Sequence, residues 1–160
     1  MTRWLTDDEQ RTWRAFGPVL RLLVDRLDRD LRSAAGMPIT YYELLVMLSE
    51  APDRTLRMSE LAQHTNSSPS RISHAVGKLE EAGWVRREHC AGDRRGWLAV
   101  LTPRGLAALK TAAPTHVASV RAHLVDVLTP AQLRQLGEIS EALLAHLSPD
   151  SPETPESRGH

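Results

Sequence analysis

A chain of 160 residues with 41% hydrophobic residues is long enough to bury one core, and because aromatic residues make up only 4%, leucine, valine and alanine must fill most of it. The formal net charge is zero, from 20 basic and 20 acidic residues, which excludes the strongly basic overall balance of many nucleic-acid-binding proteins. A single cysteine excludes an internal disulfide framework. No apolar run approaches the roughly 20 residues that a membrane-spanning helix needs. The acidic N-terminus lacks the apolar segment of a signal peptide, so we expect a cytoplasmic protein without a membrane partner.

The charge is distributed unevenly along the chain. Residues 54–104 hold nine Lys or Arg and five Asp or Glu, a local net charge of +4, and the remainder carries a net charge of −4. A basic segment within a neutral chain is the electrostatic footprint expected of a local DNA-contacting surface. Chance clustering of charges on a solvated surface is the alternative.

The first predicted helix begins after Thr6, where three acidic residues suit the positive end of a helix dipole. Apolar residues then recur at spacings of three and four, which predicts one long stripe: Phe16, Leu20, Leu23, Leu27 and Leu31. Pro18 interrupts this stripe, so we expect a kink or a break near Gly17.

A second helix is predicted from Thr40 to about Glu50. Thr40 and Glu43 have the spacing of a capping box, in which the two side chains satisfy backbone N–H groups of the first turn. Pro52 ends the pattern. The apolar residues of this helix are Leu44, Leu45, Met47 and Leu48.

Residues 58–82 have the pattern of two short helices joined by a break. In the second of these helices, Ser68 is an expected N-cap, and Pro69 fits the next position because no intrahelical N–H is needed there. Gly83 suits a left-handed residue at the C-terminal end. The inward stripe of the second helix is Ile72, Ala75, Val76 and Leu79.

The outer face of that second helix is small, polar and basic. It carries Ser70, His74 and Gly77, with Arg71, Ser73 and Lys78 on its flanks. A helix that lies in a DNA major groove needs this combination, with hydrogen-bond donors near its N-terminal end. An ordinary solvated helix face is the alternative.

Two strand-like runs, 84–90 and 97–102, flank a polar segment at Ala91–Gly96, which predicts a β-hairpin with its loop at that segment. The loop presents Arg94 and Arg95 beside Asp93. Guanidinium groups suit a narrow minor groove, where negative potential is concentrated, and Asp93 can hold one arginine extended.

Two further helices are predicted after the hairpin. They begin at Thr102–Pro103 and at Thr129–Pro130, where a hydroxyl cap precedes a first-turn proline. Pro114 predicts a bend in the first of them. A 160-residue monomer has nothing large enough to cover their apolar stripes, so we expect a partner subunit. Residues 148–160, rich in Pro, Ser and Glu, are expected to be disordered. The stripes are Leu106, Leu109, Ala113, Val117, Val120 and Leu124 in the first helix, and Leu133, Leu136, Ile139, Leu143 and Leu147 in the second.

The order and spacing of several short segments resemble the MarR (multiple antibiotic resistance regulator) family. The resemblance extends over residues 6–147 and implies a mainly α fold with a small β-hairpin wing. It implies a winged helix-turn-helix at 38–102 and a helical dimerisation region at 1–33 and 103–147. The segments that carry it are Met58–Ala62, Ser68–Arg71, Lys78–Val85, Asp93–Arg95 and Leu101–Gly105.

The resemblance also implies a dimeric transcriptional regulator, often released from DNA by a small ligand or by oxidation. The positions that match the family's Asp-x-Arg pattern are Asp93 and Arg95, with Arg95 as the minor-groove finger. A cleft between the first two helices and the base of the winged helix often takes aromatic acids in this family. The pocket candidates are therefore Trp13, Phe16, Tyr41 and Tyr42, with a role as core and interface residues as the alternative.

Metal, redox and enzymatic chemistry find less support in the sequence. Seven histidines are present, but there is no His-x-x-x-His pair, cysteine pair or carboxylate set at ligand spacing, so no metal or cofactor is expected. Cys90 is predicted at the base of the hairpin near Arg86 and Arg87, where positive charge would favour a reactive thiolate, but a bystander thiol is the favoured interpretation. No nucleophile elbow or phosphate loop is present, so an enzyme is not expected.

The sequence therefore predicts a homodimeric regulator of a palindromic double-stranded DNA operator, and a repressor relieved by a small aromatic or anionic ligand. Two alternatives stay open: a winged helix used for protein contact, which would expose apolar groups on the outer helix face, and a redox- or metal-responsive regulator of the same family. The predicted DNA-contacting residues are Ser68, Ser70, Arg71, His74, Lys78, Asp93, Arg94 and Arg95.

Overall fold

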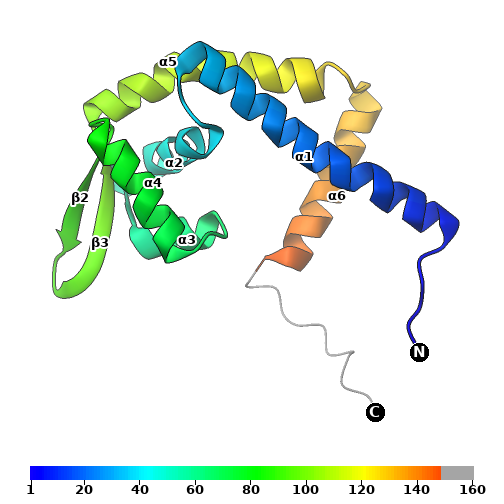
Figure 1. Ribbon diagram of the computed structural model, residues 1–160, viewed down its shortest axis with the longest axis horizontal. Coiled ribbons are helices and arrows are strands. Elements are labelled where there is room, and N and C mark those ends of the chain that lie inside the picture. Colours follow the sequence, from blue (N-terminus) through cyan, green and yellow to red (C-terminus); the bar gives the residue numbers. More distant parts are fainter. Residues whose placement is uncertain (149–160) are drawn as a thin grey trace. The chain divides into compact units, whose positions relative to one another are not determined.

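The computed structural model describes residues 1–148, with the side chains of Arg94 and Arg95 outside that description. The chain forms two compact units, which meet in sequence at Val120 and Arg121 (Figure 1). The predicted mainly α fold with a small β-hairpin wing is confirmed. The first unit contains α1 (Asp7–Ala35), α2 (Ile39–Glu50), a 3-10 turn (Pro52–Arg54), β1 (Thr55–Arg57), α3 (Met58–His64), α4 (Pro69–Glu81), β2 (Val85–Cys90), β3 (Asp93–Leu101) and α5 (Pro103–Val120), and the second contains a π-helical turn (Arg121–Val125) and α6 (Pro130–Leu147).

Helix α1 begins at a capping box and runs unbroken through Pro18. The Thr6 hydroxyl accepts a hydrogen bond from the Glu9 N–H at 3.3 Å, and the Glu9 carboxylate accepts one from the Thr6 N–H at 2.8 Å. The break considered near Gly17 is therefore wrong. Proline removes one N–H from the helix, and because this stretch of α1 is largely exposed, the carbonyl that loses its partner can be hydrated.

Helix α2 begins at Ile39, and its N-cap position is Pro38, two residues before the predicted cap at Thr40. No side chain caps it from that position. The predicted capping box of Thr40 and Glu43 is therefore wrong, because both residues already lie inside the first helical turn.

The first turn of α2 is capped instead from α1. One Asp28 carboxylate oxygen accepts a hydrogen bond from the Ile39 N–H at 2.8 Å, and the other accepts one from Arg32 Nε at 2.5 Å. Burial opposes ionisation of Asp28, but the Ile39 N–H and the Arg32 guanidinium outweigh it and lower the pKa of this carboxyl. This cap joins two helices, so it fixes the end of α1 against the start of α2.

The core of the first unit lies where the end of α1, α2, α3, α4, α5 and the sheet meet. Figure 1 shows the C-terminal part of α1 beside α5, and a hydrogen bond of 2.7 Å from Ser119 Oγ to Asp30 Oδ2 joins the two helices. The prediction of a core with few aromatic residues is confirmed. The largest fully buried side chains, each at most 2% exposed, are Leu31, Met37, Leu45, Leu48, Leu61, Val76, Leu79 and Val85.

The sheet has three antiparallel strands in the order β1-β3-β2. Ala99 in β3 pairs with Leu56 of β1 and Arg87 of β2. The prediction missed β1, a strand of three residues. The hairpin turn is also shorter than the predicted loop, since β2 ends at Cys90 and β3 already begins at Asp93.

Helix α5 is anchored at its start by Thr102 and Gly105. The predicted cap is confirmed, since Thr102 Oγ1 accepts a hydrogen bond from the Gly105 N–H at 3.0 Å and lies 2.7 Å from the Gly83 carbonyl oxygen. A Cβ on Gly105 would lie 2.0 Å from the Trp84 carbonyl oxygen, so only glycine allows this approach. The sequence Leu101–Gly105 therefore joins the end of the sheet to the turn after α4.

The predicted stripe of α5 is only partly buried. Leu109 is buried as expected, but Val117 is 55% exposed, and the buried face of the helix passes through Ala112 and Ser119 instead. Pro114 lies within a continuous helix.

Replacement of Gly105 tests this junction. We expect Gly105→Ala to lower the free energy of unfolding by about 1–3 kcal/mol or more, because the added methyl group overlaps backbone atoms that cannot move independently. Gly137→Ala in α6 is the matched control, since nothing lies within 4 Å of its Cβ position. That control should raise stability by about 0.5–1 kcal/mol through helix propensity. Chemical denaturation measures both variants, and equal stability of Gly105→Ala and the unmodified chain would contradict the close approach.

The cap from Asp28 predicts a pH-dependent stability. An acid whose pKa is lower in the folded than in the unfolded chain stabilises the fold when ionised, so its contribution is complete above the unfolded pKa of about 3.9 and is lost as the pH falls through the folded value. We expect Asp28→Asn to cost about 1 kcal/mol at pH 7 and progressively less below pH about 4. Thermal unfolding across this range measures the difference, with Asp25→Asn on the same helix as the control. A constant difference at all pH values would show that the charge of Asp28 has no role.

Candidate nucleic-acid interface

Helix α4 has the local structure that its sequence predicts. The Ser68 hydroxyl accepts a hydrogen bond from the Arg71 N–H at 3.3 Å, and Pro69 occupies the first helical position. Ile72, Val76 and Leu79 are buried, so one face of the helix packs into the core. The remaining faces are left for other contacts.

The outer face of α4 is polar and exposed, as expected. Ser70 and His74 are both exposed. Lys78 is exposed as well, but its ammonium donates a hydrogen bond of 2.8 Å to the Glu81 carboxylate. This contact raises the pKa of Lys78 and lowers the pKa of Glu81. Because both side chains are solvated, the pair can open at little cost when another anion approaches.

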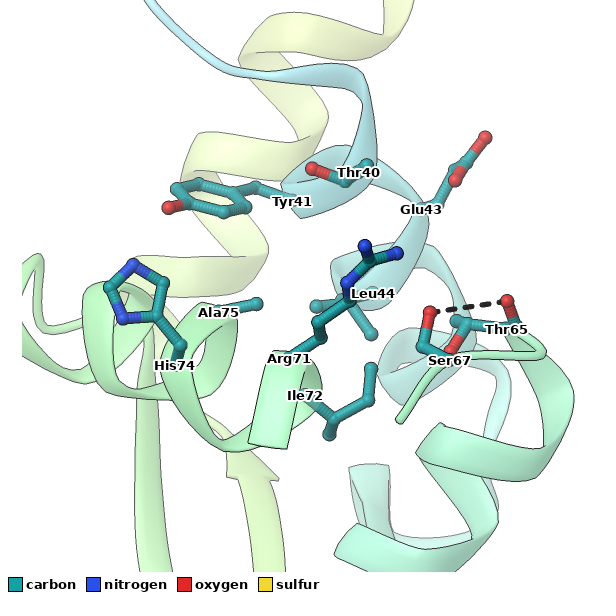
Figure 2. Close-up of a pocket in the computed structure, with 10 residues that line it drawn as sticks. All are labelled: Thr40, Tyr41, Glu43, Leu44, Thr65, Ser67, Arg71, Ile72, His74 and Ala75. Carbon is teal, nitrogen blue, oxygen red and sulfur yellow. Dashed lines mark hydrogen bonds between the residues drawn. The ribbon is translucent and has the colours of Figure 1, made fainter. Parts of the chain in front are cut away.

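Arg71 differs from the other predicted contacts, because its side chain lines a cavity between α4 and α2. Figure 2 shows its guanidinium extending from α4 toward the first turns of α2, where Tyr41 lies. The cavity has a volume of about 350 Å³. Its lining residues are Thr40, Tyr41, Glu43, Leu44, Thr65, Ser67, Arg71, Ile72, His74 and Ala75.

Of the four aromatic pocket candidates, this cavity includes only Tyr41. Tyr42 is 8% exposed and packs its ring against His116, with ring centroids 4.5 Å apart. Burial lowers the pKa of His116 and raises that of Tyr42. Trp13 is 62% exposed and Phe16 is half-buried, both in the N-terminal half of α1. The structure therefore does not bring the four together.

The hairpin of β2 and β3 is attached to α4 by Arg87, a contact that the sequence did not predict. Its guanidinium donates to the Ser73 carbonyl oxygen at 3.0 Å, and its Nε lies 3.3 Å from Glu80 Oε2. Its backbone N–H also donates to Glu80 at 3.2 Å. A Cβ on Gly77 would lie 3.0 Å from the guanidinium, so this glycine makes room for it. Side chains two residues apart share one face of a strand, so an inward Val85 would have placed Arg87 on the inner face of the sheet as well.

The predicted wing-tip residues lie in the first part of β3, beyond a two-residue turn of Ala91 and Gly92. Asp93 Oδ2 lies 3.8 Å from a guanidinium nitrogen of Arg57 at the end of β1. The side chains of Arg94 and Arg95 lie outside the described part of the structure, so their predicted DNA contacts stay predictions.

The two glycines of the predicted loop have different roles. Gly92 has a φ of 83° and supplies the left-handed turn residue, as expected. A Cβ on Gly96 would lie 2.7 Å from Asp93 Oδ2 and 2.8 Å from Cys90 Sγ. Glycine is therefore needed here, because it lets the side chains of Asp93 and Cys90 lie close to the backbone of β3.

Cys90 is at the outer end of β2 beside the turn, which corrects its predicted place at the base of the hairpin. It is 7% exposed, as the bystander interpretation requires. The neighbouring His89 stacks on Trp97 across the strands, with ring centroids 3.8 Å apart. Within residues 1–148, no three His, Cys, Asp or Glu side chains are grouped as a metal site would need. None of the described helices is both long and apolar enough to cross a membrane.

Comparison with known proteins agrees with this geometry. A sequence model of the MarR family matches residues 35–96. The HTH-type transcriptional repressor Rv2887 of Mycobacterium tuberculosis is 33% identical over 111 residues, which cover 69% of this chain and 78% of that protein.

Two solved structures from Streptomyces coelicolor are similar over nearly the whole chain. Sco3205, a MarR family transcriptional regulator crystallised in complex with DNA, is 49% identical with a TM-score of 0.87, covering 95% of this chain and 96% of that one. AbsC, a second MarR family regulator, is 47% identical with a TM-score of 0.83, covering 91% of this chain and 98% of that one. These similarities and the winged helix-turn-helix show that the chain belongs to the MarR family of transcriptional regulators, which are DNA-binding proteins and not enzymes.

Proposed function

We propose that this MarR-family chain binds a palindromic double-stranded DNA operator as a homodimer, with α4 in the major groove and the β2–β3 hairpin at the adjacent minor groove. The observation that carries the proposal is the exposed polar face of α4, formed by Ser70 and His74 beside a hairpin that Arg87 holds in place. Two-fold symmetry sets the two recognition helices about 34 Å apart, one turn of DNA. The similar Sco3205 was crystallised in complex with DNA, which supports DNA binding by this chain.

The local charge supports DNA binding over the alternative of a protein-interaction module. The segment 54–104 carries a net charge of +4 in a neutral chain. A protein-binding winged helix is expected to expose apolar groups on the outer face of α4, whereas this face carries hydroxyl and imidazole groups. We propose that the regulator acts in the cytoplasm, as expected of a DNA-binding transcriptional regulator.

Exposed apolar side chains on helices outside the winged helix support the dimer. In α1, Trp13 and Leu22 are 62% and 67% exposed, and in α6, Leu144 and Leu147 are 64% and 72% exposed. Apolar surface of this extent on separate helices is typical of an interface. We propose residues about 6–33 and 103–147 as the dimerisation region, with 38–102 as the DNA-binding region.

The dimer is tested by multi-angle light scattering at micromolar concentration. We expect a single species of twice the chain mass, because an obligate interface buries more than about 2,000 Å². Leu22→Glu should shift the protein toward monomer, whereas Arg54→Glu, an exposed substitution outside the proposed dimerisation region, should not. A monodisperse monomer of the unmodified chain would refute the proposed assembly.

We propose a repressor relieved by a small aromatic or anionic ligand. Rv2887 is named as a repressor, and the cavity between α2 and α4 offers a place for the ligand. A redox-responsive regulator is less favoured, because the thiol of Cys90 is buried. A metal-responsive one is less favoured because the described residues lack a cluster of suitable ligands.

The wing is tested with operator DNA selected from a random duplex pool. We propose that Arg95 enters the minor groove, with Arg94 nearer the phosphates and Asp93 orienting Arg95. Arg95→Ala should then weaken binding about tenfold and lower the salt slope by about one unit, whereas Arg95→Lys should keep the slope. Asp93→Ala should also weaken binding, although it removes a charge that repels phosphate.

Arg57→Ala is the control for the Asp93 variant, because Arg57 is the ion-pair partner of Asp93 in the described residues. If Arg57→Ala reproduces the effect of Asp93→Ala, the aspartate acts through Arg57 and not Arg95. Tighter binding by Asp93→Ala would overturn its orienting role. Failure of the unmodified chain to select any duplex would overturn the proposed function itself.

A further inference from the structure

We propose that a cavity between α3, α4 and the hairpin holds one phosphodiester group of the DNA backbone, with Trp97 and Ser59 as its contact residues. Neither residue belongs to the set of DNA contacts predicted from the sequence. The inference rests on the proposed function, because it needs α4 in the major groove and the hairpin at the adjacent minor groove. It adds a backbone contact that is made by neutral donors and is separate from the arginines of the wing.

This cavity, called here the hairpin-side cavity, lies on the flank of α4 that faces the hairpin. The two elements run side by side from the turn at Gly83, and Arg87 joins them (Figure 1). A phosphate backbone separates each major groove from the next minor groove, so it must pass between a helix and a hairpin that occupy the two grooves. The cavity lies on that path and has a volume of about 270 Å³. Its lining residues are Met58, Ser59, Pro69, Ser73, Arg87 and Trp97.

The polar side chains of the hairpin-side cavity are hydrogen-bond donors. Ser59 and Ser73 supply hydroxyl groups, Arg87 a guanidinium and Trp97 an indole N–H, and none of the described residues that line the cavity is acidic. Arg87 donates to Ser73 Oγ at 3.4 Å, which leaves the hydroxyl hydrogen of Ser73 for another acceptor. Such a set of donors matches a phosphodiester oxygen, the commonest acceptor in protein–DNA contacts.

Trp97 is the residue that points most directly to a ligand. Its side chain is 41% exposed on the hairpin, yet the ring is held in place by His89, with ring centroids 3.8 Å apart. Within residues 1–148, the indole N–H has no hydrogen-bond partner. Tryptophan is enriched at interfaces because its ring can be covered while its N–H bonds a partner. A fixed, exposed ring with an available donor is therefore typical of a contact residue.

A second cavity shares Ser59 and Trp97 but has a different charge. It has a volume of about 260 Å³ and is also lined by Arg57 and Asp93. The Asp93 carboxylate lies 3.8 Å from the Arg57 guanidinium, so the arginine already has an anionic partner and the aspartate repels a phosphate. The phosphodiester is therefore assigned to the hairpin-side cavity, with Ser59 and Trp97 at the boundary between the two.

Neutral donors give this contact a different salt dependence from that of the wing arginines. An arginine or lysine that neutralises a phosphate releases counterions and contributes about one unit to the salt slope. An indole N–H or a hydroxyl carries no net charge, so its loss weakens binding without changing that slope. The one cation of the hairpin-side cavity, Arg87, already has an ion-pair partner, since its Nε lies 3.3 Å from Glu80 Oε2.

The first experiment removes the donors from the protein. Trp97→Phe deletes the indole N–H and keeps a ring beside His89, and Ser59→Ala deletes one hydroxyl. We expect Trp97→Phe to bind the selected operator about tenfold more weakly and Ser59→Ala about fivefold more weakly, both with an unchanged salt slope. Trp4→Phe is the matched control, because Trp4 is 84% exposed near the N-terminus, and it should have no effect.

Thermal unfolding shows whether each variant keeps its fold. If Trp97→Phe is destabilised, Ser59→Ala decides, because an exposed serine near the start of a helix is replaced by a better helix former. Unchanged affinity of Ser59→Ala and of a stably folded Trp97→Phe overturns the proposal. A salt slope that falls by about one unit in either variant also overturns it, because the lost contact would then be a charged one.

The second experiment removes the charge from the DNA. Each phosphate of one operator half-site is replaced in turn by a neutral methylphosphonate, and fluorescence anisotropy compares the unmodified chain with Trp97→Phe. We expect one position, between the major groove that α4 occupies and the minor groove at the wing, where the replacement weakens binding of the unmodified chain about tenfold but hardly affects Trp97→Phe.

Equal penalties in the two proteins at every position overturn the proposal, because Trp97 would then act on the fold and not on a phosphate. That outcome leaves DNA binding itself established, since the unmodified chain still binds the unmodified duplex. Failure of the unmodified chain to bind that duplex marks failure of the proposed function instead.

Discussion

The contact between Arg87 and α4 determines the geometry on which DNA recognition depends. The proposed placement of α4 in the major groove and of the hairpin at the minor groove needs a fixed separation between the two elements, yet the chain joins them only by a short turn at Gly83. Arg87 supplies the second connection, since it reaches from β2 to the Ser73 carbonyl and to Glu80 on one flank of α4. The opposite flank of the helix is left for Arg71 and the cavity against α2. The two flanks of α4 therefore make different contacts, and the polar face between them stays exposed.

Much of this architecture follows from local sequence rules. The caps at Ser68 and Thr129, the buried stripe of α4 and the turn at Gly92 depend on neighbouring residues, so periodicity and capping chemistry were sufficient to predict them. What could not be predicted depends on contacts between distant elements. The cap of α2 comes from Asp28, eleven residues earlier, and the capping box expected within α2 was wrong for that reason.

The candidate site shows the same division. The spacing of apolar residues in α4 was enough to predict its polar outer face. The direction of the Arg71 side chain could not be predicted in this way, because helix periodicity places a long side chain on a flank without saying which neighbour it reaches. Likewise, Tyr41 and Tyr42 are adjacent in sequence, yet one lines the cavity and the other is buried against His116 of α5. Only the packing of α5 on α2 separates their roles.

The burial of Cys90 at the outer end of β2 has a practical consequence. Its side chain is only 7% exposed and its sulfur lies where a Cβ on Gly96 would be only 2.8 Å away, so the pairing of β2 and β3 limits the access of a thiol reagent. Because the chain has one cysteine, alkylation reports on one place alone. The alkylation rate therefore reports how often the end of the hairpin opens in the native protein, and no cysteine has to be introduced by mutation.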